Sequence, residues 1–239
     1  MYQEKLKATY KPTIRIKLDA QVADQPWNSK VGGVPYLPTG MAYPVDANGE
    51  KLQFLAQINF EEIPALEGYP TQGILAFYIG SDDLCGLDFD DPMNQDGFKV
   101  IYFENITHDV NITAPTYAEE SPIQSESSML FELINQHITT SDFHCERILG
   151  EEDYEKFVEQ EYENEDEGGH LLGGYPFFTQ GDPRQYNEKI KDYVLLFQLD
   201  SDDDHAICWG DVGVANFFIH PNDLKNRDFS CVAYTWDCS

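Results

Sequence analysis

The sequence predicts a mainly β fold, a β-rich α+β protein whose two similar halves form one compact body. Hydrophobic residues make up 41% of the 239 residues and aromatic residues 13%, with many short Val/Ile/Phe/Tyr runs, and this pattern favours strands over helices. The stretch SKVGGVPYLPTG (residues 29–40) is nearly repeated as HLLGGYPFFTQGDPR (residues 170–184). A chain of this length can bury a sizeable core.

The repeat extends beyond these two stretches. Gly32 corresponds to Gly173 and Gln57 to Gln198 with one offset, since 173 − 32 = 141 and 198 − 57 = 141. Further along, GILAFYI matches GVANFFI at a nearly equal offset. Matching segments in the same order and at nearly constant spacing indicate an internal duplication of a unit made of a GGxP loop and two strands. The period is too long for a solenoid.

Each part of this unit has a physical interpretation. Glycine permits a positive φ or a close backbone approach and proline fixes the exit, so GGxP predicts a loop. The short apolar runs FLAQI and YVLLFQL predict buried strands. Gln57 and Gln198 lie inside these runs, and a buried amide needs partners, so we expect both to hydrogen-bond to the backbone.

Four segments organise the chain. Residues 1–23 form an N-terminal strand segment, in which TIRIKL can pair with either half. Residues 24–127 are the first repeat, residues 128–168 a connector with an acidic helix, and residues 169–239 the second repeat. We expect the halves to exchange strands.

The connector departs from the repeat. SESSMLFELINQHI is compatible with a short helix or a strand edge. Residues 151–167 predict a helix that ends at Gly168 and Gly169, because four apolar side chains recur at helical spacing: Tyr154, Phe157, Val158 and Tyr162. Ten residues of this helix are acidic and only Lys156 is basic, which gives a net charge of 1 − 10 = −9.

The charge and the cysteines limit the classes of partner and compartment. The net charge of −28 disfavours nucleic acids and anionic membranes, which need basic surfaces, and would attract basic proteins; solubility alone is the alternative reading. Five cysteines without a CxxC motif predict free thiols in a reducing cytoplasm. The sequence shows no signal-peptide pattern and no apolar run near the roughly 18 residues that a membrane helix needs.

One acidic loop has the carboxylate spacing of a calcium loop. Asp200, Asp202 and Asp204 alternate, and Asp211 stands at the twelfth position. His205 occupies the sixth position, where such loops need glycine, and a strand rather than a helix precedes the loop. We therefore keep calcium as a possible cofactor beside a simpler interpretation, a solvated acidic loop. The loop from Asp82 to Asp96 has no regular ligand spacing.

The sequence carries no nucleophile elbow, Walker loop or zinc motif, so it leans away from an enzyme. His170 adjoins the second GG pair, and a cleft would form if the two GG loops faced each other across a pseudo-twofold axis. The candidate ligand-binding residues there are His170, Gln57, Gln198, Asp182, Arg184, Trp209 and Asp211. The alternative is that these side chains bond to the backbone and hold loops.

The motifs SKVGGVPYLP, LAQINFEEIP, HLLGGYPFFTQGDPR, LLFQLDS and WGDVGVANFFI together resemble the YwqG-like family of bacterial proteins, a domain family of unknown function. The resemblance covers residue 24 to the C-terminus and implies a mainly β fold with internally similar halves. It implies no activity. The matching positions are Gly33, Pro35, Gln57, Gly174, Pro176, Gln198, Gly210, Asp211 and Gly213.

Two functional hypotheses follow. The first is an acidic cytoplasmic interaction protein, in the manner of immunity proteins, that binds a basic partner through residues 151–167 and 82–96. The alternative is a small-molecule-binding protein or enzyme that uses a cleft between the two repeats. A calcium-responsive module is a third, weaker reading.

Overall fold

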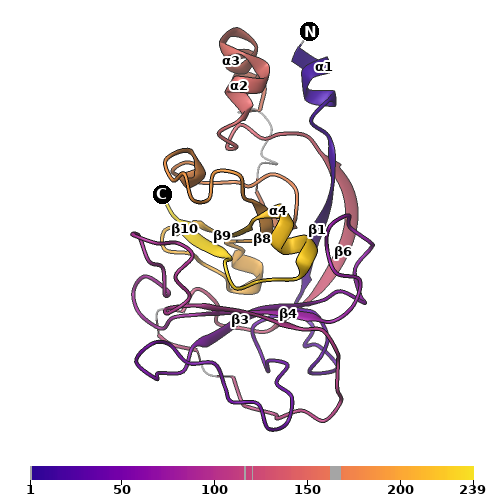
Figure 1. Cartoon of the computed structure of the whole chain (residues 1–239), viewed down its shortest axis with the longest axis vertical. Coiled ribbons are helices and arrows are strands. Elements are labelled where there is room, and N and C mark those ends of the chain that lie inside the picture. Colours follow the sequence, from indigo (N-terminus) through magenta and orange to yellow (C-terminus); the bar gives the residue numbers. More distant parts are fainter. Residues whose placement is uncertain (1, 116, 120, 162–167) are drawn as a thin grey trace.

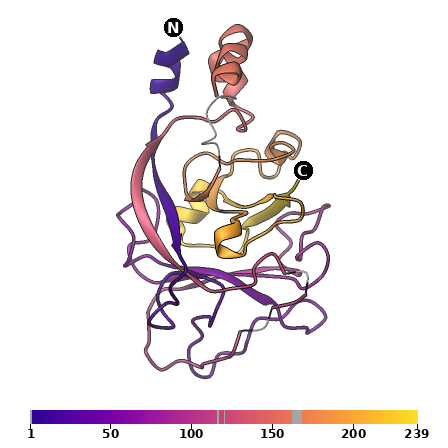
Figure 2. The same cartoon turned by 180° about the vertical axis from the view of Figure 1, so that it is seen from behind.

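A computed structural model describes residues 2–115, 117–119, 121–161 and 168–239. Within them the chain forms a mainly β fold, as predicted: one curled ten-stranded sheet in the order β10-β9-β8-β7-β1-β6-β2-β3-β4-β5, with every neighbouring pair antiparallel (Figures 1 and 2). The strands are β1 (Lys11–Asp19), β2 (Lys30–Val31), β3 (Gln53–Asn59), β4 (Ile74–Ile79), β5 (Lys99–Phe103), β6 (Ser127–Gln136), β7 (His170–Leu172), β8 (Val194–Asp200), β9 (Val214–Ile219) and β10 (Ala233–Asp237).

The short apolar runs of the repeat form strands that are buried on both faces. Every residue of β3, β4 and β9 is buried, which explains why these strands read as continuous apolar runs rather than as alternating patterns. The sheet curls so that β3 and β4 lie against β8 and β9 (Figure 1). Phe77 of β4 marks the contact, because its ring centroid lies 4.8 Å from those of Phe197 and Phe217.

Two strands from outside the repeats, β1 and β6, join the two halves; an exchange of strands between the halves themselves stays a prediction. β1 precedes the first repeat in the chain, yet it pairs with β7 of the second repeat. β6 precedes the second repeat and pairs with β2 of the first. β1 and β6 also pair with each other from Lys11–Gln136 to Asp19–Ser128, and Figures 1 and 2 show them as a long curved ribbon along one side. The stretch SESSMLFELINQHI, for which a helix was an alternative, is this central strand.

The two glutamines of the repeat make equivalent hydrogen bonds to the backbone, as predicted. The Oε1 atom of Gln57 accepts from the Tyr36 N–H at 2.7 Å, and that of Gln198 accepts from the Phe177 N–H at 2.7 Å. Both amide groups donate to the backbone before their GG motif. The strand registers match too, because β3 and β8 each shift register at the corresponding place. A common origin of the two halves stays a prediction.

Four α-helices and two 3-10 turns complete the described residues: α1 (Tyr2–Lys7), α2 (Cys145–Leu149), α3 (Glu151–Glu161), α4 (Pro221–Asn226), η1 (Pro183–Gln185) and η2 (Asp203–His205). The predicted acidic helix is α3, and α1, α2 and α3 gather at one end of the molecule around the buried Phe157 (Figure 1). Tyr162 and residues 163–167 lie outside the described residues. None of the described helices has the length and apolar character needed to span a bilayer.

We predict that Gln57→Leu and Gln198→Leu each lower the free energy of unfolding by about 1–3 kcal/mol, because each leaves a buried backbone N–H without its acceptor. Urea unfolding measures the loss. The exposed Gln21 provides the control, since Gln21→Leu removes no such bond. Equal stability of all three variants would contradict the assigned role.

Candidate functional site

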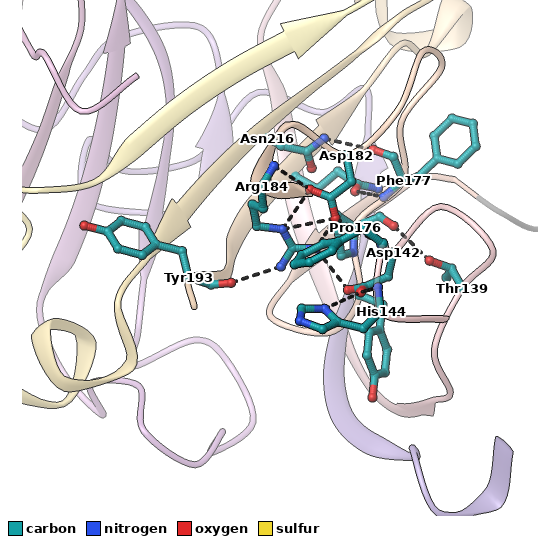
Figure 3. Close-up of polar contacts among 12 residues, drawn as sticks. Thr139, Asp142, His144, Pro176, Phe177, Asp182, Arg184, Tyr193 and Asn216 are labelled. Carbon is teal, nitrogen blue, oxygen red and sulfur yellow. Dashed lines mark hydrogen bonds and ion pairs between the residues drawn. The ribbon is translucent and has the colours of Figure 1, made fainter. Parts of the chain in front are cut away.

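Arg184 lies at the centre of a buried ion cluster (Figure 3). Its Nη2 atom is 2.5 Å from Asp182 Oδ2 and 3.0 Å from Asp142 Oδ2. Its Nε donates to Asp182 Oδ1 at 2.9 Å, and its Nη1 donates to the Tyr193 carbonyl at 3.0 Å. Every guanidinium nitrogen therefore has a protein acceptor, and the cluster joins the 139–144 segment, the loop after the second GG pair and the start of β8.

Local sequence explains how this cluster forms. Asp182 caps η1 by accepting from the Arg184 N–H at 3.0 Å, and Pro183 pre-sets the first position of the turn. The turn folds the Arg184 side chain back onto Asp182, the residue that caps the turn. The guanidinium carbon also lies 4.8 Å from the Phe218 ring centroid and 5.4 Å from that of Phe143, which adds cation–π contacts.

The charges in the cluster support one another. Burial alone would raise the pKa of Asp142, but the Arg184 charge and hydrogen bonds from His144 hold that pKa below its ordinary value. Burial alone would lower the pKa of Arg184, but Asp182 and Asp142 keep it above the ordinary value. Because the side chains of the cluster are bonded to one another and to the backbone of three segments, we interpret it as a structural cluster that holds these loops in place.

A second polar cluster surrounds His170. Its Nδ1 accepts from the Asp200 N–H at 3.1 Å, so Nε2 carries the proton and faces Asp202 Oδ2 at 3.3 Å. His205 Nδ1 lies 2.9 Å from the same carboxylate oxygen. Burial lowers the pKa of His170 more than Asp202 raises it. Burial would raise the pKa of Asp202, but the two histidines lower it.

The four aspartates proposed for calcium do not form one ligand group. Asp200 accepts from the Gly169 and Ser201 N–H groups, and Asp202 is held by the two histidines, whereas Asp204 and Asp211 are exposed. The described part of the chain contains no cluster of three or more His, Cys, Asp or Glu side chains placed to hold a metal ion. Calcium binding stays a prediction without an assembled site.

The seven predicted cleft residues do not converge on one site. Gln57 and Gln198 are committed to the backbone, Asp182 and Arg184 to the ion cluster, and His170 to the 200–205 loop. Trp209 is fully buried, and its ring centroid lies 6.1 Å from that of Trp236. Asp211 is exposed. None of the seven lines the two pockets described next, both of which lie between elements of different repeats.

The first, which we call the aromatic pocket, has a volume of about 320 Å³. Residues 87–92 of the first repeat form one wall, residues 183–190 form the opposite wall, and β9 and β10 form the floor. The side chains of Phe89 and Tyr186 line it from the two walls and are 77% and 83% exposed. Asp88 is the carboxylate that lines it.

The second, which we call the Lys11 groove, has a volume of about 280 Å³. Residues 66–69 of the first repeat face the second GG pair, the start of β8 and Leu224 of α4. Lys11 lines the groove, and its Nζ lies 3.6 Å from the Tyr175 ring centroid. Burial lowers the pKa of Lys11 to about 8, with Asp142 raising it and Arg184 lowering it.

The two GG pairs do not face each other across either of these two pockets, and a cleft between the GG loops stays a prediction. Both GG pairs are closely packed: a Cβ on Gly32 would lie 2.2 Å from the Ser125 carbonyl oxygen, and one on Gly174 would lie 2.3 Å from Gln136 Oε1. Of the two pairs, the second also lines the Lys11 groove. Sequence reasoning missed Phe89, Tyr186 and Lys11. Their types carry no signal, because each acquires its role from a loop or strand of the other repeat.

This fold defines a mainly β domain in which one ten-stranded antiparallel sheet curls around its core. The family model described as "Domain of unknown function (DUF1963)" matches residues 29–238, so the chain belongs to that family. The narrower YwqG-like name stays a prediction. A search of the curated proteins finds no match.

We predict that Arg184→Met lowers the free energy of unfolding by about 3–5 kcal/mol, because it leaves the buried Asp182 and Asp142 carboxylates without their cation. Chemical denaturation gives the value. Arg227→Met is the matched control: Arg227 pairs with Glu104 on the exposed surface, and its loss should cost less than about 1 kcal/mol. Similar losses for both variants would argue against the cluster's structural role.

We also predict that His170 makes stability depend on pH. Its folded-state pKa is below 6.5, so the unfolded chain binds more protons there, and the free energy of unfolding falls as pH drops below 6.5. One such group contributes at most about 1.4 kcal/mol per pH unit. Denaturation between about pH 7 and about pH 5 should show a shallower slope for His170→Gln than for wild type. The same slope for His170→Gln and wild type would contradict this assignment.

Proposed function

We propose that this protein is a binding module that captures a basic segment of a partner protein in the aromatic pocket. The observation that carries the proposal is the exposure of Tyr186 and Phe89, which are the two most exposed large hydrophobic side chains among the described residues. They come from loops of different repeats, yet they line the same pocket. Exposed aromatic side chains around a concave apolar site are typical anchors of protein interfaces.

The charge around the pocket favours a cationic partner. Asp88 lines it, and three hydrogen bonds, led by that from Asn94, lower the pKa of Asp88, so its carboxylate stays ionised. Asp90 follows in the same loop and is exposed. Arginine or lysine side chains of the partner would stack on the two aromatic rings and pair with these carboxylates. The net charge of −28 would accelerate their approach.

The wall that carries Phe89 is preorganised. Asp82 accepts from two backbone N–H groups of its own loop, at 2.9 and 3.0 Å, and Asp88 does the same at 2.9 and 3.1 Å. Lys189 Nζ lies 3.3 Å from Asp91 Oδ2 and links the two walls. A loop fixed in this way loses little conformational entropy when it binds.

The acidic helix α3 supports the same function at a distance. Its described carboxylates lie at the far end of the molecule from β3 and β4, so they add to the long-range field (Figure 1). An immunity-type role, in which the captured protein is toxic, is the narrower form of the proposal. Cys208 and Cys231 are exposed thiols, as suits a reducing cytoplasm.

A second candidate function rests on the Lys11 groove. A groove between elements of different repeats suits a small-molecule ligand, which is the alternative that the sequence predicted. The protein can have both functions, because the aromatic pocket and the Lys11 groove share no lining residue.

We predict that the double variant Phe89→Ser/Tyr186→Ser binds short peptides of alternating arginine and leucine at least about tenfold more weakly than wild type, since both aromatic anchors are lost. Fluorescence anisotropy measures the affinity. Rising salt should weaken wild-type binding, and Asp90→Asn should reduce its association rate.

Ile112→Ser is the matched control, because Ile112 is 67% exposed but does not line the pocket. Peptides of alternating glutamate and leucine should not bind. Equal affinity of the double variant and the Ile112→Ser variant would refute the assignment of the partner to this pocket.

A further inference from the structure

We propose that the Lys11 groove binds a small apolar carboxylate, whose charged end is held by the Lys11 ammonium and the Gly174 N–H. This inference rests on the second candidate function, a small-molecule site in the Lys11 groove, and names its class of ligand; it is separate from the capture of a basic protein, because the ligand and the site are different. The inference rests on a cation without a carboxylate partner and a backbone donor without an acceptor among the described residues, and on the apolar walls beside them.

Lys11 forms no ion pair with the carboxylates that the structure describes, although the chain has 43 acidic residues. Its side chain is half-buried, with Nζ over the Tyr175 ring at 3.6 Å. Asp142 and Arg184 act on it only through the longer-range field, with opposite signs. A half-buried ammonium in this position gains most from an anion that enters the groove.

Gly174 supplies the backbone donor. Its equivalent in the first repeat, Gly33, donates its N–H to the Tyr117 hydroxyl at 2.8 Å. Gly174 is buried as well, but its N–H has no acceptor among the described residues. Buried backbone N–H groups are nearly always satisfied, so an acceptor on a ligand fits this position.

The rest of the groove suits an apolar body. Leu66, Val194, Leu195 and Leu224 line it, and the Tyr69 hydroxyl is already used, since it donates to the Leu195 carbonyl at 2.9 Å. A Cβ on Gly173 would lie 3.1 Å from Leu66 Cδ2 and 3.3 Å from the Tyr69 hydroxyl oxygen. The glycine therefore keeps this part of the groove free of a side chain.

The charges in the groove define the class of ligand. Lys11 is the cationic side chain among the lining residues, and one ammonium with one N–H suits a monoanion better than a phosphate dianion. Glu67 lines the groove too, and it is exposed. Its repulsion directs the carboxylate of the ligand toward Lys11 and leaves the apolar part near residues 66–69.

The test compares sodium octanoate with 1-octanol, which has the same chain without the charge. We expect titration calorimetry to show octanoate binding at least about tenfold more tightly than octanol. The amide signal of Gly174 should move on binding in a nitrogen–proton correlation spectrum. Lys11→Met should lose this preference for octanoate. Lys51→Met is the matched control, because the Lys51 ammonium also lies over a tyrosine ring, that of Tyr43, but outside the groove.

The pH dependence of octanoate affinity shows whether the ligand is held by the charge of Lys11 or only by the shape of the groove. With a pKa of about 8, Lys11 loses its proton above that pH, so octanoate affinity should fall as pH rises past 8. Lys11→Arg should keep its affinity there, since arginine stays charged. Equal binding of octanoate and octanol by wild type would overturn the proposal. Undiminished octanoate binding by Lys11→Met would overturn it too, as would loss of octanoate binding in Phe89→Ser/Tyr186→Ser. The absence of any octanoate binding by wild type would also overturn it.

Discussion

The antiparallel pairing of β1 with β6 is the constraint on which the rest of the structure depends. These two strands lie at the centre of the sheet, and each also pairs with the short strand at the start of the other repeat. Backbone groups of buried strands need partners, so β2 and β7 each depend on a strand that precedes the opposite repeat. The halves therefore share both a sheet and a core, in which Phe77 packs against Phe197 and Phe217.

The same loop design meets different neighbours in the two halves. Both GG pairs have positive φ and both are followed by a segment whose N–H is accepted by the glutamine of the next strand. In the first half, Tyr117 and Glu126 fill the space beside Gly33. In the second half Thr13 and Gln136 lie beside Gly174, and Lys11 with the 66–69 loop lines a groove next to it. A local motif thus sets the loop, and its neighbours decide whether it encloses space.

The surface is mainly acidic, whereas the interior holds charges of both signs. Carboxylates dominate the solvent-exposed loops and α3, whereas Lys30 and Arg184 are buried, Arg184 together with Asp142 and Asp182, and Lys11 is half-buried. Burial lowers the pKa of Lys30 to about 8, as it does for Lys11, and Glu126 and Glu62 partly oppose this. The negative surroundings favour the charged form of each cation. The molecule consequently offers two different chemistries, an acidic aromatic pocket outside and a cationic groove between the repeats.

The sequence by itself determined the mainly β class, the buried strands and the backbone bonds of Gln57 and Gln198, because strand burial and amide satisfaction are properties of short local patterns. It did not determine that SESSMLFELINQHI is a strand, since β6 alternates between buried and exposed positions irregularly and gains its identity from β1 and β2. Tertiary structure alone buried Arg184, a residue type that is usually exposed, and brought Phe89 to Tyr186. The physical reason is that pockets and ion clusters form between segments distant in the chain, where the spacing of residues along the sequence carries no information about which loops will meet.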